Sequence, residues 1–421
     1  MGPRTDHPRH VCIGFTEVAG YYGELARGLD ELGVRTTFLT ARAHPFGYEL
    51  PPGQPLTARL AHRLGRAELR SSGLRRRAVQ ALRLLLVGVG FAVCLVRCDA
   101  FVIGFPNSSL HLGPMWLLRR LHRPVVTVFH GSDHRPPYCD GGWIADLTGA
   151  GLAAEAARRR RLVVAAERTG LVIANPLSSQ HHVAPVICFQ VIGIPRAPTP
   201  PPVRPSGGAM RLVHAPSELA IKGTDRIRSA VAAVQAAGHV IEYRELSGVP
   251  NQEVRAALRE CDLVIDQCFS DTTMAGLGAE AAEEGAPTLI ASLGPAAFDL
   301  LPAAGRPPSI TVNPDDLTAA LGDAIADRAA LDALGRAAHD FVTTSWSRRA
   351  VAERYLRVLG PGPDPAWLIE PTAVEHPWGC GLERASVVAR VRAVLDHGGD
   401  EALSLPDPGQ RRSFQAIVEP G

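Results

Sequence analysis

The chain has 421 residues, and its 46% hydrophobic and 20% charged residues are typical of a folded protein rather than a disordered one. Its formal net charge of +2 gives no general reason to expect nucleic acid as a partner. The length exceeds what one hydrophobic core ordinarily organises, so we expect two domains. The first residues contain no apolar signal core, and we therefore expect a cytoplasmic protein.

The cysteines and histidines give no indication of a metal site. The eight cysteines are scattered, and no CxxC pair occurs. The pair His181-His182 has no nearby third ligand in the sequence. We expect neither a bound metal nor a disulfide framework in a chain of this size.

The chain opens with a predicted βαβ unit. Residues 11–15 form an apolar strand, and residues 34–40 form a second one. Between them, Leu25, Leu29 and Leu32 recur at helical spacing. This order of strand, helix and strand predicts the start of a parallel sheet.

Two glycines, Gly20 and Gly23, lie in the turn between this first strand and its helix. They lack the full GxGxxG order of a dinucleotide-binding turn. A tight turn from strand to helix explains them equally well.

A basic stretch follows a proline-containing loop. From Arg59 to Arg83 there are eight arginines against one acidic residue, Glu68. The plainer interpretation is a solvated basic helix face, and the alternative is contact with anionic lipid headgroups. The uncharged run 84–96 is too short to span a bilayer and suits a helix that covers a sheet. A later arginine run, 158–161, is also expected to be an exposed helix face.

Strand and helix patterns then alternate to residue 360. In the first half, the apolar strand 125–129 leads directly into His130-Gly-Ser-Asp133. In the second half, strands beginning at 211, 240, 262 and 287 alternate with helical patterns, which implies a parallel sheet covered on both faces. We therefore predict an α/β protein with an N-terminal domain at 1–195, a proline-rich linker at 196–209, a C-terminal domain at 210–345, and a helix with an extension of unassigned role at 346–421.

Lys222 is the only lysine, although the chain contains 44 basic residues. Lysine carries a compact charge on a flexible stem, whereas arginine presents a rigid planar fork. The two are not interchangeable where a phosphate is approached end-on in a tight pocket. Chance survival of one lysine is the alternative interpretation.

A second phosphate-binding feature lies in the C-terminal half. Residues 272–278 precede a helix that carries Glu280. Free amides at a helix N-terminus, together with the ammonium of Lys222, would form a diphosphate site, and Glu280 could accept hydrogen bonds from a ribose diol. Ligands of open parallel sheets bind at the carboxyl ends of the strands, so His130 is expected on the opposite side of the same crevice. The plainer alternatives are a helix-terminal preference for Glu280 and a hydrogen-bonded strand-end histidine for His130.

These motifs resemble a known family. The nucleotide-sugar half of GT-B glycosyltransferases, and of retaining family four in particular, is similar to residues 216–224, 262–267 and 276–287. The acceptor half of the same family is similar to residues 20–32 and 129–133. The likeness spans most of the chain before residue 360.

The resemblance implies a GT-B fold, in which two Rossmann-like domains face each other across a cleft. It also implies a nucleoside-diphosphate sugar as donor substrate, without cofactor or metal. Lys222 would neutralise the diphosphate, Glu280 would hold the ribose, and His130 would lie beside the donor sugar. The implied donor-binding residues are Gly20, Gly23, Ser217, Lys222, Thr272, Thr273, Gly276, Leu277, Gly278 and Glu280, and the catalytic candidates are His130, Asp133 and Lys222.

The family's retaining outcome would let the leaving phosphate accept the proton of the acceptor. Asp133 is the competing candidate for the base, and its plainer role is to cap the turn in which it lies.

The sequence departs from the family at two positions. The arginine that often precedes the lysine is missing from residues 215–218, and Arg226 is the candidate substitute. The first of the family's two glutamates is replaced by Thr272, which follows Asp271. The identity of the donor sugar is therefore not predicted.

We predict a glycosyltransferase (class EC 2.4) whose acceptor is a cell-envelope saccharide, a lipid-linked carrier or a secondary metabolite. A nucleotide-sugar 2-epimerase is an alternative, but it needs acid and base carboxylates in the crevice. A non-catalytic subunit that binds a sugar nucleotide is another; the missing arginine and glutamate favour it, whereas Lys222 and Glu280 oppose it. If the 59–83 region contacts lipid, the protein lies peripherally on the inner face of the membrane. No nucleic-acid partner is expected.

Overall fold

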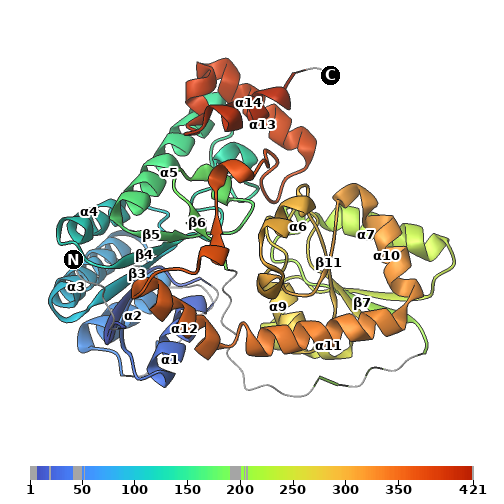
Figure 1. The fold of residues 1–421 in the computed structure, drawn as a ribbon, viewed down its shortest axis with the longest axis horizontal. Helices are drawn as coiled ribbons and strands as arrows, with labels where there is room; N and C mark the ends of the chain where they lie inside the picture. Colours follow the sequence, from blue (N-terminus) through green and yellow to red (C-terminus); the bar gives the residue numbers. More distant parts are fainter. Residues whose placement is uncertain are drawn as a thin grey trace.

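The computed structural model describes residues 7–18, 20–40, 50–51, 53–189, 201–202, 204 and 207–419. Within these residues the chain forms two α/β lobes, each built around its own sheet (Figure 1). Most of the predicted linker 196–209 lies outside the described residues.

The sheet of the first lobe has seven described strands in the order β12-β6-β5-β4-β3-β1-β2. Neighbouring strands are parallel except for β12, which pairs antiparallel with β6. The central strands are apolar runs buried on both faces, as a helix-covered parallel sheet requires. The strands are β1 (His10–Phe15), β2 (Arg35–Thr40), β3 (Ala100–Gly104), β4 (Val125–Val128), β5 (Leu171–Ile173), β6 (Val186–Ile187) and β12 (Leu368–Ile369).

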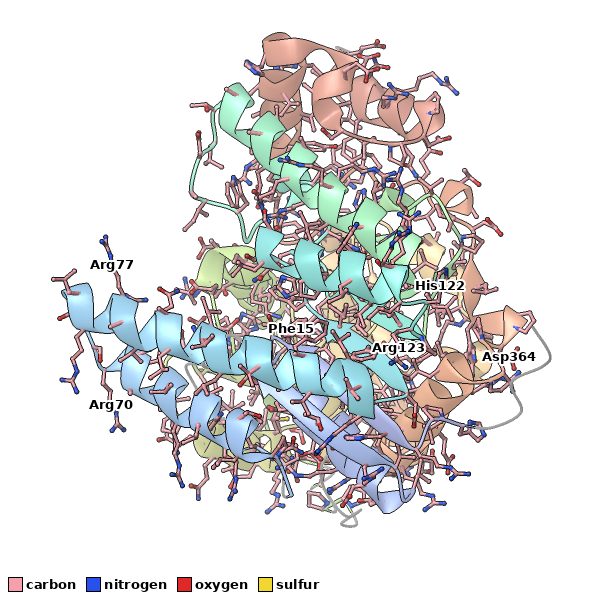
Figure 2. The ribbon with its side chains drawn as sticks, turned by 90° about the vertical axis from the view of Figure 1, so that its left-hand side faces the viewer. Phe15, Arg70, Arg77, His122, Arg123 and Asp364 are labelled. Atoms are coloured by element: carbon pink, nitrogen blue, oxygen red, sulfur yellow. The ribbon has the colours of Figure 1, made fainter. Side chains whose placement is uncertain are left out.

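Two layers of helices enclose this sheet. Alternate residues of β3 belong to separate buried clusters: Phe101 and Ile103 pack with α2 to α5, and Ala100 and Val102 pack with α1 and α12. Figure 2 shows the layer that contains α2 to α5. The helices are α1 (Tyr21–Glu31), α2 (Leu56–Leu69), α3 (Gly73–Arg97), α4 (Leu112–Arg120), α5 (Gly149–Thr169) and α12 (Arg348–Leu359). The predicted apolar helix at 84–96 is thus the second half of α3.

The second lobe has five described strands, all parallel, in the order β11-β10-β9-β7-β8. Its edge strand, β8, alternates between half-buried and exposed residues, as expected for a strand with one open side. The elements are β7 (Met210–His214), α6 (Leu219–Lys222), α7 (Thr224–Ala236), β8 (Ile241–Glu245), α8 (Asn251–Glu260), β9 (Leu263–Ile265), α9 (Gly276–Glu283), β10 (Thr288–Ala291), β11 (Ile310–Val312), α10 (Leu317–Ala326) and α11 (Arg328–Thr344).

The chain returns to the first lobe after α11, where α12 packs against α1 (Figure 1). The two helices approach so closely that a Cβ at Gly28 would lie 2.2 Å from the carbonyl oxygen of Arg348. The hydroxyls of Tyr21 and Tyr355 lie 2.6 Å apart in the same contact. Glycine at position 28 is therefore required by packing.

The C-terminal extension belongs structurally to the first lobe. It supplies β12 to that sheet, and its helices α13 (Arg384–Gly398) and α14 (Pro408–Ala416) form a separate apolar cluster with α5. A hydrogen bond of 2.9 Å from the Tyr138 hydroxyl to the carbonyl oxygen of Leu403 joins the two parts. The sequence did not predict this docking.

Candidate active site

The carboxyl ends of β1 and β4 bring four polar side chains of the first lobe together. Glu17 follows β1, Tyr22 lies in the first turn of α1, and His130 and Asp133 follow β4. The two strands flank β3, so their carboxyl ends open at the same edge of the sheet. The Tyr22 hydroxyl lies 2.8 Å from Nε2 of His130 and links the two segments.

His130 is half-buried in an aromatic environment. The rings of Tyr21, Tyr22 and Phe105 lie 5.2, 5.6 and 6.2 Å from the imidazole, centroid to centroid. Burial lowers the pKa of His130 to about 4, so the imidazole is neutral near pH 7. It can exchange hydrogen bonds with a substrate there, but it offers no positive charge.

Asp133 forms the turn that carries His130. Its carboxylate accepts hydrogen bonds from the backbone N–H groups of His130 at 3.0 Å and of Gly131 at 2.9 Å. Burial raises the pKa of Asp133 to about 7, although these backbone hydrogen bonds oppose the shift. The geometry matches the turn-capping alternative, and the role of Asp133 as a base stays a prediction.

Glu17 was not predicted from the sequence. Its buried carboxylate accepts hydrogen bonds from the N–H groups of Val18, Tyr22 and Gly23 at 2.8 to 3.1 Å. Burial raises the pKa of Glu17 to about 7. The amides of Tyr22 and Gly23 begin α1, and Gly20 precedes them in a left-handed conformation with φ of 81°. The turn that holds the predicted donor-binding residues Gly20 and Gly23 therefore already binds a carboxylate of the protein.

In the second lobe, Lys222 ends α6 and is held at the carboxyl end of β9. Its ammonium donates a hydrogen bond of 2.5 Å to Oε1 of Gln267 and lies 3.3 Å from Oδ1 of Asp266. Asp266 is fully buried, whereas the Lys222 side chain is 17% exposed. An ammonium has three N–H donors, so one remains for a ligand beyond these two described partners.

Gly278 connects this ion pair to the N-terminus of α9. A Cβ at Gly278 would lie 3.4 Å from Oδ2 of Asp266, so the first turn of α9 packs directly on the carboxylate that Lys222 neutralises. No described side chain caps α9, and Gly276 is exposed at its start. Lys222 and the first turn of α9 therefore approach different oxygens of the same carboxylate.

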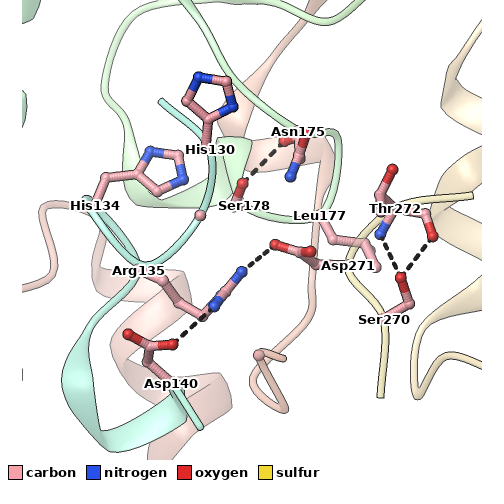
Figure 3. Close-up of polar contacts among 12 residues, drawn as sticks. His130, His134, Arg135, Asp140, Asn175, Leu177, Ser178, Ser270, Asp271 and Thr272 are labelled. Atoms are coloured by element: carbon pink, nitrogen blue, oxygen red, sulfur yellow. Dashed lines mark hydrogen bonds and ion pairs between the residues drawn. The ribbon is translucent and has the colours of Figure 1, made fainter. Parts of the chain in front are cut away.

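The residues at 270–273 continue the same hydrogen-bond network. Nε2 of Gln267 donates to Oγ of Ser270 at 2.6 Å, and this hydroxyl bonds both the N–H and the carbonyl of Thr272 (Figure 3). Thr272 and Thr273 are both buried. The network couples the position of Lys222 to the loop at residues 270–273.

The other predicted donor-binding residues are less closely connected. The two carboxylate oxygens of Glu280 lie 3.1 and 3.2 Å from Nδ2 of Asn251, which begins α8. Ser217 is exposed in the loop between β7 and α6. Arg226 pairs with Asp315 and Glu383, so it already has two acidic partners. The ribose and donor roles of these residues stay predictions.

An ion pair joins the two lobes beside the site. Arg135 of the first lobe pairs with Asp271 of the second lobe, and its other terminal nitrogen donates to Oδ1 of Asp140 at 3.0 Å (Figure 3). All three side chains are buried. Gly131 makes the approach possible, because a Cβ there would lie 2.6 Å from Nη2 of Arg135.

The inter-lobe pair is part of a longer network that the sequence did not predict. Arg159 on α5 donates to Oδ2 of Asp140 at 2.6 Å and to Oε1 of Glu155 at 2.8 Å. The expectation that residues 158–161 form an exposed face is therefore wrong for Arg159, which is 4% exposed. The reason is that Arg159 pairs inside the lobe with Asp140, 19 residues away in the sequence, and with Glu155 one turn earlier on the same helix.

The C-terminal extension reaches this same boundary. The N–H of Gly381 donates to the carbonyl oxygen of Phe269 in the second lobe at 2.9 Å. The neighbouring carbonyl, of Cys380, accepts from the N–H of Gly141 in the first lobe at 2.9 Å. Residues 380–381 thus hold the two lobes together next to Arg135 and Asp271. Across the described part of the chain, no group of three or more histidine, cysteine or acidic side chains is arranged to hold a metal ion.

Comparisons with known proteins identify the class of fold. No protein-family model matches the chain, and no curated protein matches its sequence. Among solved structures, sucrose-phosphate synthase from Thermosynechococcus elongatus matches with a TM-score of 0.54 and 13% sequence identity, over 83% of this chain and 98% of that chain. Anabaena Alr3699/HepE, in complex with UDP and glucose, gives a TM-score of 0.45 and 14% identity over 84% and 99% of the two chains. The glycosyltransferase SnogD from Streptomyces nogalater gives 0.39 and 16% over 84% and 100%.

The first of these matches, together with the two parallel sheets, shows that the protein has a GT-B fold of two Rossmann-like lobes. The predicted fold class is confirmed. Membership of family four and a retaining outcome stay predictions, because sequence identities of 13 to 16% support a shared fold but not a shared family or reaction course.

Proposed function

We propose that the protein is a glycosyltransferase that takes a sugar from a nucleoside-diphosphate donor. The observation that carries this proposal is the arrangement of Lys222, Asp266 and the uncapped N-terminus of α9. An ammonium with a remaining donor and a row of helix-terminal amides is a site for a diphosphate. Four of the matched structures also contain a nucleotide, which their names give as UDP, UDP-glucose or thymidine diphosphate.

The two lobes differ in how their helix termini are occupied. The amides of Tyr22 and Gly23 at the start of α1 bind the Glu17 carboxylate, whereas α9 has no side-chain cap. A second anion at α1 would have to displace Glu17. We therefore place the diphosphate at α9 and Lys222, and leave the first lobe for the acceptor.

In the proposed reaction, the bond between the anomeric carbon and the diphosphate breaks as the acceptor oxygen bonds to that carbon. Negative charge grows on the departing diphosphate, and preorganised positive groups that meet it lower the barrier. Lys222 performs this role, and Asp266 and Gln267 fix the position of its amine. In the retaining course, the departing phosphate accepts the proton that the acceptor hydroxyl loses.

His130 and Asp133 position the acceptor side of the site. Tyr22 and the Asp133-capped turn fix the His130 imidazole, which is neutral near pH 7. A neutral imidazole can orient sugar hydroxyls without attracting a second anion. The acceptor itself is a saccharide, a lipid-linked carrier or a natural product, and no metal is assigned a role.

The test is incubation of the full-length protein with a panel of nucleotide sugars, with thermal shift and nucleotide release as readouts. We expect one donor to raise the melting temperature and to release its nucleoside diphosphate slowly. The Lys222→Ala variant should lose most of the release. The matched control is Lys222→Ala combined with Asp266→Asn, which removes the buried carboxylate that the single variant leaves uncompensated.

The two alternative functions give different results in this assay. A change in the sugar's configuration without nucleotide release would identify a 2-epimerase. Binding of a donor without any release, even with candidate acceptors present, would identify a non-catalytic subunit.

A further inference from the structure

An exposed apolar stripe runs along the outer side of α3. The opposite side of this helix packs on the sheet through Val87, Phe91 and Cys94. The exposed side chains repeat at helical spacing over the whole second half of the helix, and they are Leu82, Leu85, Val89, Val93 and Val96, with exposed fractions of 44 to 83%. Soluble monomers rarely expose so continuous an apolar surface, which marks a contact with another phase or molecule.

A stripe of arginines accompanies it on α2. Arg59, Arg63, Arg66 and Arg70 are spaced by four, three and four residues, so they share one helix face. All four are exposed, and none pairs with a carboxylate among the described residues. The only acidic residue of residues 56–97 is Glu68, which pairs with buried Arg83 at 2.7 Å. The hairpin thus carries a large uncompensated positive charge.

The two helices meet in an arginine-lined hollow at the tip of the hairpin. The hollow has a volume of about 430 Å³ and is lined by Arg63, Arg66, Ala67, Arg70, Ser71 and Arg75. Figure 2 shows Arg70 and Arg77 at this projecting tip. Planar guanidinium groups bind phosphate oxygens in pairs, so the hollow suits a phosphate headgroup.

We propose that the α2–α3 hairpin docks the protein onto an anionic lipid bilayer. The arginines bind lipid phosphates, and the apolar stripe of α3 enters the boundary between headgroups and acyl chains. Trp116 on neighbouring α4 is 65% exposed on the same helix layer and adds a side chain typical of that boundary. This proposal does not depend on the proposed function.

Charge and polarity together select this occupant. Nucleic acid would neutralise the arginines but would leave the apolar stripe in water. A second copy of the chain, packed by two-fold symmetry, would bring the same arginines close to each other. An anionic bilayer offers negative charge and apolar volume at the same surface.

The helix lies on the bilayer rather than crossing it. By length and composition α3 alone could cross a membrane, and it is the one such helix among the described residues. However, Val87, Phe91 and Cys94 belong to the core of the first lobe, so insertion of α3 would open that core.

The test is cosedimentation of the full-length protein with vesicles of phosphatidylcholine, with or without phosphatidylglycerol. We expect binding that requires phosphatidylglycerol and weakens with salt. The variant Arg63→Gln, Arg66→Gln, Arg70→Gln should lose affinity by on the order of 100-fold, at roughly fivefold for each arginine. The variant Leu85→Ser, Val89→Ser, Val93→Ser should also lose binding, although its arginines are intact.

A matched control removes the same charge elsewhere. Arg244, Arg336 and Arg412 are exposed outside the hairpin, and their change to glutamine should leave vesicle binding close to wild type. The proposal is overturned if phosphatidylglycerol does not increase the vesicle binding of the wild-type protein. It is also overturned if the control variant loses as much vesicle binding as the hairpin variant. Resistance of the vesicle-bound protein to alkaline carbonate extraction would overturn it as well, because such resistance indicates a helix that spans the bilayer. So would a wild-type dimer in the absence of vesicles that becomes monomeric in the Leu85→Ser, Val89→Ser, Val93→Ser variant.

Discussion

The ammonium of Lys222 lies 3.3 Å from Oδ1 of Asp266, and the other oxygen of the same carboxylate faces the first turn of α9. This single contact gives the only lysine of the chain a fixed position at the strand ends of the second lobe. Lys222 therefore neutralises the buried carboxylate of Asp266, and it is also placed to meet the charge of a bound diphosphate. Its two roles can be separated by experiment.

We expect Lys222→Ala to lower the rate of nucleotide release by on the order of 100-fold, since it removes one preorganised group that meets the charge of the leaving diphosphate. Part of any loss of stability comes from the uncompensated Asp266. The double variant with Asp266→Asn should recover stability in urea unfolding but not activity. Recovery of full activity in the double variant would contradict the proposed role of the lysine.

Asp133 should act through its turn rather than as a base. Both of its carboxylate oxygens accept backbone N–H groups, so the Asp133→Asn variant loses part of the cap that positions His130. We expect a modestly lower rate, and the limb near pH 7 that the titration of Asp133 gives the wild-type pH–rate profile should be missing from the variant. A loss on the order of 10⁴-fold with donor binding unchanged would instead make Asp133 the base, and the retaining course through the leaving phosphate would then be wrong.

Glu17 should make the protein less stable as the pH rises. Burial raises its pKa from the ordinary 4.5 to about 7 in the folded protein, so between these values the folded state keeps a proton that the unfolded chain has lost. Its contribution to stability is fully present below pH 4.5 and is lost as the pH rises through about 7. The Glu17→Gln variant should therefore gain up to about 3 kcal/mol relative to wild type between pH 4.5 and pH 8. Urea unfolding of both proteins across this range measures the difference, and parallel profiles would show that the carboxyl is not protonated.

The pair of Arg135 and Asp271 should couple the stabilities of the two lobes. Breaking a buried ion pair by removing one partner costs about 3–5 kcal/mol, because the other charge remains buried. We expect this loss from Asp271→Asn, and a double variant with Arg135→Met should lose less than the sum of the two single changes. Urea unfolding of the four proteins gives the coupling, which would be near zero if the lobes separate readily in solution.

The sequence alone determined the alternation of strands and helices, the two-lobe α/β architecture, and the unusual lysine. These depend on local periodicity and composition, which each segment carries by itself: the helices at 224–236 and 251–260 follow directly from such patterns. The predicted glycine at 278 and the amides beside it were also visible in the sequence.

Only the tertiary structure decided which charges meet. Asp266, Asp271 and Arg159 look like ordinary strand-end or surface residues until folding buries them against partners that are distant in the chain. The same holds for residues 378–418, whose docking on α5 depends on apolar contacts between segments that are distant in the chain and not on any local pattern. A charged side chain becomes part of a site because folding buries it and pairs it with another charge. Both depend on residues elsewhere in the chain, so the local sequence does not determine them.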